Sequence, residues 1–253
     1  MTAEERFLFD LQGYLVVKGV LSGGELKTLN EIADERIAKD ENPNERNWRR
    51  SRCSLWAQEC VDLIDHEKLL PYWTSLLGPF FRLDHDYCIF MRKGADGGQL
   101  HGGAHVTHRA GDHWYKCQDG VMRNGLTVFT YNLSPANKGD GGFACVPASH
   151  KTNFLTKMPR DVRAFQREAH YVVQPEVEAG DVVIFTEALI HGTMPWTADH
   201  QRRGLLYKYS PGHSAWSQKG YSLNEFEGFQ LTDRQKRILE PPCVGGREPV
   251  LQN

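Results

Sequence analysis

The spacing of apolar residues changes near Pro79, and the change divides the chain into a helical first third and a β-rich remainder. Residues 14–17 form a short β-prone run after Gly13. Ser22 and Glu25 then have the spacing of a capping box, in which each side chain satisfies a free backbone N–H. A helix is expected from there to about residue 39, because four apolar residues recur on one helical face: Leu26, Leu29, Ala33 and Ile37.

A second helical segment and a third are predicted on either side of the β-rich region. Residues 40–52 are polar and indicate a loop, and residues 56–77 then predict a helix that Gly78-Pro79 ends. Its expected buried residues are Leu69, Leu70, Trp73, Leu76 and Leu77. A last helix is expected from Thr232, where Thr-x-x-Gln again resembles a capping box.

Short β-prone runs separated by Gly, Pro, Asn and Asp follow Pro79. This spacing favours an antiparallel sandwich or barrel over a parallel sheet with crossover helices. The runs cover residues 80–91, 126–133, 143–146, 171–177, 181–185 and 205–209. Neither a linker nor an internal repeat interrupts the pattern. One α+β domain is therefore predicted over residues 1–253, with a β core over roughly 80–212 and the N-terminal helices packed on one sheet.

Composition narrows the class of protein. The 253 residues include 30 Lys and Arg against 32 Asp and Glu, a formal charge of −2, which argues against a nucleic-acid or polybasic membrane partner. No apolar run is long enough for a membrane span, and the acidic N-terminus does not resemble a signal peptide. The six scattered cysteines are expected to be free thiols in a reducing cytoplasm. The oligomeric state stays open.

Two of the eleven histidines stand in informative contexts. His101 follows a β run and a glycine-rich loop, and His191 comes after a buried strand that begins at Gly180. Arg202 lies eleven residues beyond His191 and begins the next β region. This order suits a non-haem iron oxygenase on a double-stranded β-helix. Imidazoles bind one face of Fe(II), and an arginine can pair bidentately with the buried distal carboxylate of 2-oxoglutarate.

Three segments give the chain a family resemblance. They are residues 9–22 (FDLQGYLVVKGVLS), residues 141–151 (GGFACVPASHK) and residues 180–203, which run from Gly-Asp-Val-Val through His191-Gly-Thr193 to Arg-Arg. Together they resemble the phytanoyl-CoA dioxygenase-like branch of the Fe(II)/2-oxoglutarate oxygenases. The resemblance implies a jelly-roll, cupin-like double-stranded β-helix. It also implies an enzyme that uses Fe(II), 2-oxoglutarate and O₂ to oxidise a C–H bond of a small molecule.

The resemblance also assigns roles to individual residues. His101 and His191 would be the iron ligands, Arg202 would anchor 2-oxoglutarate, and Thr193 would help to hold the same carboxylate. Arg203 is the rival of Arg202, because neighbouring residues of a strand point to opposite faces and only one can enter the barrel. The count to the family arginine favours Arg202.

The proximal motif departs from the family pattern His-x-Asp. It reads His101-Gly102-Gly103, so the carboxylate is missing. Four interpretations follow: a hydroxylase whose third ligand is supplied by Asp112, Asp119 or Glu187; a halogenase in which chloride fills the site vacated at Gly103; a binding protein that has lost catalysis; and, more remotely, a zinc hydrolase. The hydroxylase-type oxygenase is preferred.

The remaining candidate side chains receive simpler interpretations. His105, His108 and His113 are expected in a polar loop, and His150 in a turn. Trp114 and Trp196 flank the two metal segments and are the tryptophans expected in the substrate pocket, whereas core or rim positions are expected for Trp48, Trp56, Trp73 and Trp216. Residues 47–52 (NWRRSR) are interpreted as a solvated loop, and binding of an anionic substrate is the alternative for this short cluster.

Overall fold

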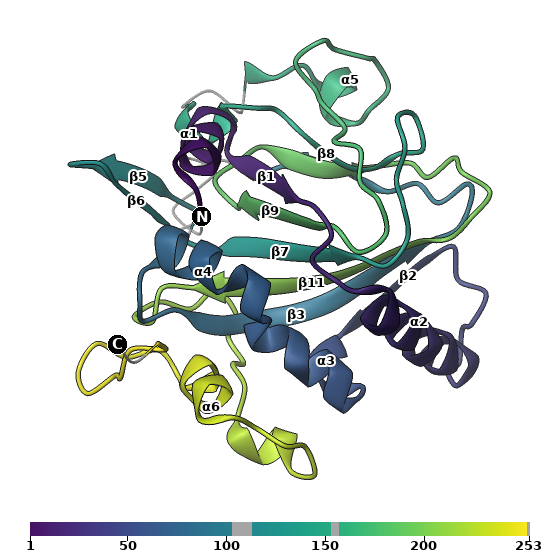
Figure 1. The fold of residues 1–253 in the computed structure, drawn as a ribbon. Coiled ribbons are helices and arrows are strands. Elements are labelled where there is room, and N and C mark those ends of the chain that lie inside the picture. Colours follow the sequence, from purple (N-terminus) through teal and green to yellow (C-terminus); the bar gives the residue numbers. More distant parts are fainter. Residues whose placement is uncertain (103–112, 153–156, 252–253) are drawn as a thin grey trace.

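Two antiparallel sheets form the centre of the molecule (Figure 1). The protein is described from a computed structural model, which covers residues 1–102, 113–152 and 157–251. The larger sheet has the order β1 (Tyr14–Val17), β9 (Val182–Thr186), β7 (Thr127–Asn132), β11 (Arg202–Ser210), β3 (Arg82–Met91) and β2 (Asn47–Ser51). The smaller sheet has the order β4 (Gly98–His101), β10 (His191–Met194) and β8 (Gly142–Cys145). The predicted antiparallel α+β class is confirmed.

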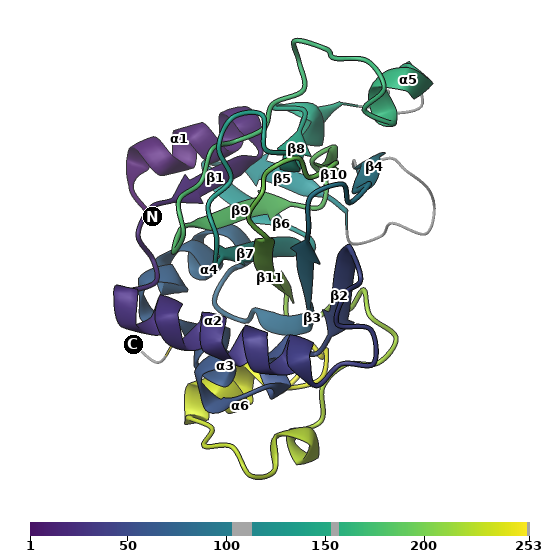
Figure 2. The same ribbon diagram turned by 90° about the vertical axis from the view of Figure 1, so that its right-hand side faces the viewer.

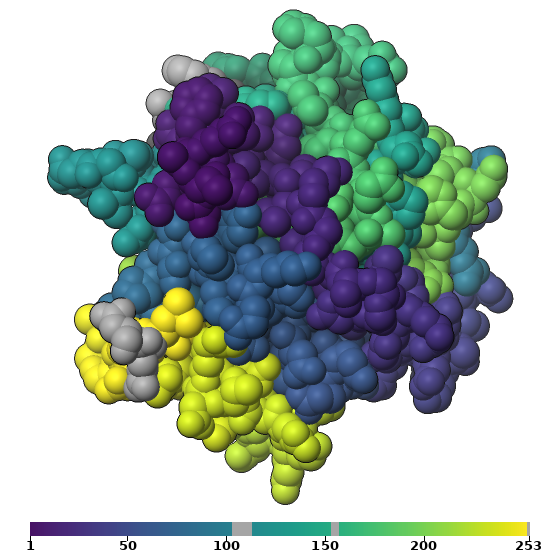
Figure 3. Space-filling view, in the orientation of Figure 1, coloured from purple at the N-terminus to yellow at the C-terminus, as the bar shows by residue number. Residues whose placement is uncertain are grey.

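Helices cover the outer face of the larger sheet. They are α1 (Ala3–Gln12), α2 (Gly23–Ala38), α3 (Gln58–Asp62), α4 (Leu70–Leu77) and α6 (Asp233–Leu239), while α5 (Arg160–Arg163) lies elsewhere. Figure 2 shows α2 and α4 on the side of this sheet opposite to β4 and β10. In the space-filling view, the helices and the C-terminal segment cover much of one face of the molecule (Figure 3). The predicted helix after Ser22 is confirmed, and it begins with the predicted capping box.

The alternation of side chains along the strands separates two layers of the core. Outward residues of β7 and β11 pack under the helices, where Trp73 of α4 lies 5.0 Å, between ring centroids, from both Phe129 and Tyr209. The hydroxyls of Tyr131, Tyr207 and Tyr209 donate to carbonyls of the helical segment 60–64. Inward residues of the same strands face the smaller sheet, and this inner face carries the site described below.

The segment 56–77 is helical but is not one helix. It divides into α3, two short 3₁₀ turns over residues 63–69, and α4. Pro71 explains the break, because proline has no N–H to donate and is tolerated only in the first turn of a helix. The helix therefore restarts at Leu70, and Pro71 lies within its first turn.

Several strand predictions need correction. The segment predicted as a loop, residues 40–52, contains β2, an edge strand whose Trp48 is buried against Phe90. Residues 171–177 form only isolated bridges, Cys145↔Val173 and Ala136↔Val177, and not a strand. The polar strands β4 and β10 were not predicted, nor was the hairpin of β5 (Tyr115–Gln118) and β6 (Val121–Asn124).

Two expectations from composition can be compared with the structure. All six cysteines are free, as predicted. Among the residues described, no helix has the length and apolar character needed to cross a bilayer.

Candidate active site

A cavity of about 280 Å³ lies between the inner face of the larger sheet and the smaller sheet. The larger sheet contributes inward residues at alternate positions, which is the parity that a pleated strand dictates. The smaller sheet contributes β4 and β10. The polar and charged residues that line the cavity are Asn47, Arg49, His101, His113, Thr130, Glu187, His191, Thr193, Arg202 and Lys208.

The two histidines singled out in the sequence lie side by side on neighbouring strands. His101 ends β4, His191 begins β10, and the two residues are direct partners in the antiparallel register. Their ring centroids are 4.4 Å apart and the rings are tilted by 54°. The pairing of β4 with β10 therefore brings two histidines that are ninety residues apart in the sequence into contact.

Both imidazoles are oriented in the same way. Nδ1 of His191 lies 2.7 Å from the carbonyl oxygen of Leu189, and Nδ1 of His101 lies 2.8 Å from that of Gln99. A carbonyl oxygen only accepts, so each Nδ1 carries a proton, and in the neutral form of each ring Nε2 keeps its lone pair. Two Nε2 atoms are thus available to a metal ion, and the second nitrogen of each ring is fixed by the backbone, as is typical of metal-binding histidines.

Burial keeps His191 neutral. Loss of solvent lowers the pKa of His191 to about 3, although the nearby Glu187 carboxylate acts in the opposite direction. Gly102 makes this dense packing possible. Its φ is +90°, and a Cβ there would lie 2.5 Å from the Leu189 carbonyl oxygen, the same atom that orients His191. A side chain at position 102 would therefore displace the residue that holds the imidazole.

Arg202 enters the cavity as a buried cation. It is 5 % exposed, and its polar contact is a long one, 3.7 Å from Nη1 to the Met91 sulfur. Burial lowers the pKa of Arg202 to about 10, which still leaves it charged at neutral pH. Its guanidinium packs on the backbone of Gly142, where a Cβ would come within 2.9 Å of Nε. In the described part of the chain no carboxylate pairs with it.

Arg203 points to the other face of the same strand. Its Nη1 donates to Asn30 of α2, its Nη2 to Asp34, and its Nε donates to Gln201 at 2.8 Å. These contacts lie on the outer, helix-covered face of the sheet. Of the two neighbouring arginines, the structure therefore brings Arg202, and not Arg203, to the cavity. Thr193 of β10 also lines the cavity and is half-buried.

A buried ion pair lies beside His191, and the sequence analysis did not predict it. Nζ of Lys208 donates to Oε1 of Glu187 at 2.5 Å, and Oε2 of Glu187 lies 3.7 Å from Nε2 of His191 and 3.6 Å from Nε2 of His113. Burial alone would raise the pKa of Glu187, but the Lys208 charge and then the histidines hold it below its ordinary value. The parity of β11 was the available signal, since residues 202, 204, 206 and 208 share one face.

The structure places the candidates for a third iron ligand in different positions. Gly103 and Asp112 lie outside the described residues, as do His105 and His108. Asp119 is exposed in the turn of the β5–β6 hairpin and does not line the cavity. Glu187 binds Lys208 through Oε1, and its Oε2 faces His113 and His191. Within the ranges that the structure covers, no group of three or more His, Cys, Asp and Glu side chains is arranged to hold a metal ion.

The tryptophan predictions need correction. Trp196 is fully buried and donates to the carbonyl of His200, and Trp114 is not among the cavity-lining residues. The cavity tryptophan is instead Trp216, which stacks on His113 at 4.6 Å. His150 lies in a short turn, as predicted, with Nε2 3.1 Å from the Asp10 carbonyl oxygen.

The enclosed cavity, with its paired imidazoles and buried arginine, agrees with the double-stranded β-helix oxygenases as a class. The family model for phytanoyl-CoA dioxygenase (PhyH) matches residues 9–204. The chain therefore belongs to this family, and it is an Fe(II)/2-oxoglutarate-dependent enzyme. The resemblance inferred from the three sequence segments is confirmed.

Solved structures with the same fold support the predicted jelly-roll core. HygX from Streptomyces hygroscopicus, solved with nickel and 2-oxoglutarate, is 22 % identical with a TM-score of 0.77, covering 85 % of this chain and 89 % of that chain. The 2-oxoglutarate-dependent epimerase SnoN from nogalamycin biosynthesis is 18 % identical with a TM-score of 0.61, covering 82 % and 81 %. AviO1 from Streptomyces viridochromogenes Tue57 is 17 % identical with a TM-score of 0.60, covering 82 % and 94 %. A comparison with curated proteins finds no match.

Proposed function

We propose that His101 and His191 hold Fe(II) through their Nε2 atoms, and that Arg202 and Thr193 hold the distal carboxylate of 2-oxoglutarate. The reaction proposed is hydroxylation of a C–H bond in a small molecule. When bound, iron and 2-oxoglutarate would supply the oxidising chemistry with O₂: 2-oxoglutarate would be converted to succinate and CO₂, with one oxygen atom of O₂ in succinate and the other in the hydroxylated product. The protein binds and orients the reactants and limits the access of water.

The single observation that carries this proposal is the buried Arg202. An unpaired charge inside a protein is costly, and it is retained where a ligand supplies the counter-charge. A dicarboxylate that reaches from the two histidines to Arg202 would do so. Arginine suits this role because its planar guanidinium can pair bidentately with a carboxylate.

Neighbouring side chains prepare the site without binding a ligand. The two backbone carbonyls orient both rings with Nδ1 on the protein side, so each Nε2 faces the position proposed for the metal. Phe185 packs on His191 with a centroid distance of 4.7 Å and gives the ligand side of the cavity an apolar wall. Fixed ligands and few competing waters are the conditions under which a metal-bound reactant meets one chosen C–H bond.

A small-molecule substrate agrees with the size of the cavity. Its volume of about 280 Å³ lies just below the range for small-molecule sites, roughly 300–1,000 Å³. HygX has been solved with hygromycin B bound, at 24 % identity to this chain. A substrate about as large as hygromycin B would place its reacting part inside the cavity and the rest of the molecule at the cavity mouth.

Matched arginine variants test the proposal. Arg202→Ala should weaken binding of 2-oxoglutarate to the Mn(II)-loaded protein by about 2–5 kcal/mol, because it removes the partner of a buried anion. Arg203→Ala should leave this affinity unchanged, since that residue contacts α2. Isothermal titration calorimetry measures both. A larger loss in Arg203→Ala would contradict the assignment.

Metal binding is tested separately. His101→Ala and His191→Ala should each abolish high-affinity Mn(II) binding, because each removes one of the two proposed imidazole ligands. Near-normal affinity in either variant would exclude that residue as a ligand.

Halogenation is the second candidate, and one observation favours it. Asp119 lies away from the cavity, and within the described residues no group of three or more His, Cys, Asp and Glu side chains is arranged to hold a metal ion. A chloride in the iron coordination site that the family aspartate fills, and that Gly103 would leave open, would carry the same charge as that carboxylate. Product mass with and without chloride distinguishes the candidates: a chlorinated product only with chloride supports halogenation, and a hydroxylated product under both conditions supports hydroxylation.

A further inference from the structure

Two cavity-lining residues have no part in holding iron or 2-oxoglutarate. Arg49 projects from the edge strand β2, and Trp216 lies in the segment that follows β11. Both line the same cavity as His101, His191 and Arg202. They belong to elements far apart in the sequence, and neither is needed to complete the core.

Arg49 presents a cation that no acid neutralises in the described part of the chain. Its guanidinium carbon lies 4.0 Å from the centroid of the Tyr87 ring, a contact that holds the planar group flat against the aromatic face. Its neighbour Arg50, on the opposite face of β2, is paired with Asp40 and Glu45. Stacking leaves the N–H edge of Arg49 available, which is the edge that binds carboxylates and phosphates.

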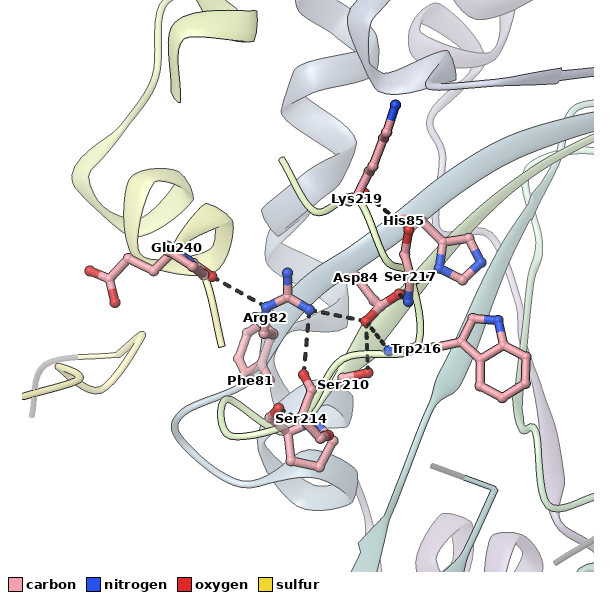
Figure 4. A network of polar contacts seen from close by, with 12 residues as sticks. Phe81, Arg82, Asp84, His85, Ser210, Ser214, Trp216, Ser217, Lys219 and Glu240 are labelled. Carbon is pink, nitrogen blue, oxygen red and sulfur yellow. Dashed lines mark hydrogen bonds and ion pairs between the residues drawn. The ribbon is translucent and has the colours of Figure 1, made fainter. Parts of the chain in front are cut away.

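Trp216 presents an exposed aromatic face that is held firmly from behind. It is 44 % exposed, and its ring stacks on His113 with an interplanar angle of 20°. The backbone N–H groups of Trp216 and Ser217 donate to the buried carboxylate of Asp84 at 2.8 and 2.9 Å. Figure 4 shows this network, with the indole pointing away from Asp84.

Arg82 completes the anchor beneath Trp216. It pairs with Asp84 at 3.0 Å, and both side chains are almost fully buried. The loop is therefore fixed by charged hydrogen bonds on its inner side, while its one large aromatic ring stays exposed. A large exposed aromatic ring on the wall of a cavity is suited to contact with a ligand.

The other cations that line the cavity have assigned partners, and Arg49 does not. Lys208 is neutralised by Glu187, and Arg202 is assigned to the distal carboxylate of 2-oxoglutarate. Among the described lining residues Arg49 is the remaining permanent cation, and no further carboxylate opposes it. The positive charge of Arg49 would repel a cationic substrate, and a neutral substrate would form no ion pair with it.

We propose that the substrate to be oxidised is a small organic anion. Its carboxylate or phosphate group pairs with Arg49, and its body lies against the indole of Trp216, which turns the opposite part of the molecule towards the histidine pair. This inference rests on the proposed function, because it assigns Arg202 to 2-oxoglutarate and leaves Arg49 for the substrate.

Calorimetry on protein saturated with Mn(II) and 2-oxoglutarate tests it, with phenylacetate, phenyl phosphate and neutral phenylacetamide as probes. At least one acid should bind about tenfold more tightly than the amide, as expected for a hydrogen bond to a charged group. The tighter of the two acids identifies the preferred group. Arg49→Gln should abolish the preference, and the matched Arg50→Gln should retain it. Trp216→Ala should weaken acid and amide alike.

Three results would overturn the proposal: no acid binds, acid and amide bind equally, or Arg49→Gln keeps the preference. Acids that compete with 2-oxoglutarate would place the anion at Arg202 and also contradict the role of Arg49. Titration of 2-oxoglutarate alone into Arg49→Gln separates this proposal from the previous one. Wild-type affinity there, together with lost acid binding, supports both. Failure of wild type to bind 2-oxoglutarate contradicts the proposed function and not the anion site.

Discussion

At the scale of single residues, the candidate active site combines positions that the sequence identified with side-chain directions that the structure supplies. His101 and His191 were identified by their contexts in the sequence, and the structure brings them together as strand partners. The choice between Arg202 and Arg203 rested on a count, because strand parity alone does not say which face is inward. The structure supplies that direction: Asn30 and Asp34 hold Arg203 on the outer face.

The residues that sequence reasoning missed depend on tertiary partners. Lys208 gains its role only because Glu187, twenty-one residues earlier in the chain, enters the same cavity from the turn after β9. Arg49 was assigned to a solvated loop because residues 40–52 are polar and contain Pro43, and the alternative, binding of an anionic substrate, rested on a motif of only six residues. Its strand is an edge strand, where charged side chains are common. No local pattern distinguishes an arginine in a loop from one at the wall of a cavity.

The Glu187–Lys208 pair gives a prediction about stability. Lys208→Met should destabilise the metal-free protein by about 3–5 kcal/mol, because it leaves a buried carboxylate without its counter-charge. The double variant Lys208→Met/Glu187→Gln should recover much of this loss, since it removes both charges. Urea unfolding measures the free energies. A single variant as stable as wild type, or a double variant no more stable than the single one, would contradict the inferred coupling.

At the scale of elements, local signals were sufficient where they were strong. The Ser22 capping box and its apolar face predicted α2 closely, and Thr232 predicted the start of α6. The long helix predicted over residues 56–77 was wrong because the signal of Pro71 was not used. The strands β4 and β10 were missed because each has only four residues and a polar sequence. Strands that form a site lose the apolar alternation by which strands are found.

The contact between α1 and the turn after β8 gives a prediction about pH. His150 of this turn is buried, and loss of solvent, with the charge of Lys151, lowers its pKa to about 4. A histidine whose folded pKa lies below its unfolded value stabilises the fold above pH 6.5, and this stability is lost as the pH falls towards 4. Between pH 6.5 and 5, wild type should lose stability faster than His150→Gln, by about 1 kcal/mol per pH unit.

Urea unfolding at several pH values measures this difference. The comparison concerns the slope with pH and not the absolute stability, because the substitution also changes a hydrogen bond to Asp10. The other buried histidines that the structure describes, His113 and His191, are present in both proteins, so their contributions cancel. Equal slopes in the two proteins would show that His150 does not take up a proton on unfolding in this range.

At the scale of the whole molecule, the two faces of the larger sheet have different roles. The outer face of β3, β7 and β11 packs under the helices through aromatic residues such as Trp73, Phe129 and Tyr209. The inner face of the same strands carries Arg202, Lys208 and Tyr87 towards the cavity. One alternating sequence therefore provides both the core that stabilises the fold and the charged wall of the site. This division could be anticipated from the β pattern and the family resemblance, but the partners across the cavity could not.

The most direct test of the central claim is a crystal structure with Mn(II) and 2-oxoglutarate, with the metal located by its anomalous signal. The account predicts one Mn(II) bound by Nε2 of both His101 and His191, and the distal carboxylate of 2-oxoglutarate paired with Arg202. The map would also identify the remaining ligand, whether a carboxylate, water or halide. A metal bound away from either histidine, or 2-oxoglutarate paired with another cation, would contradict the account.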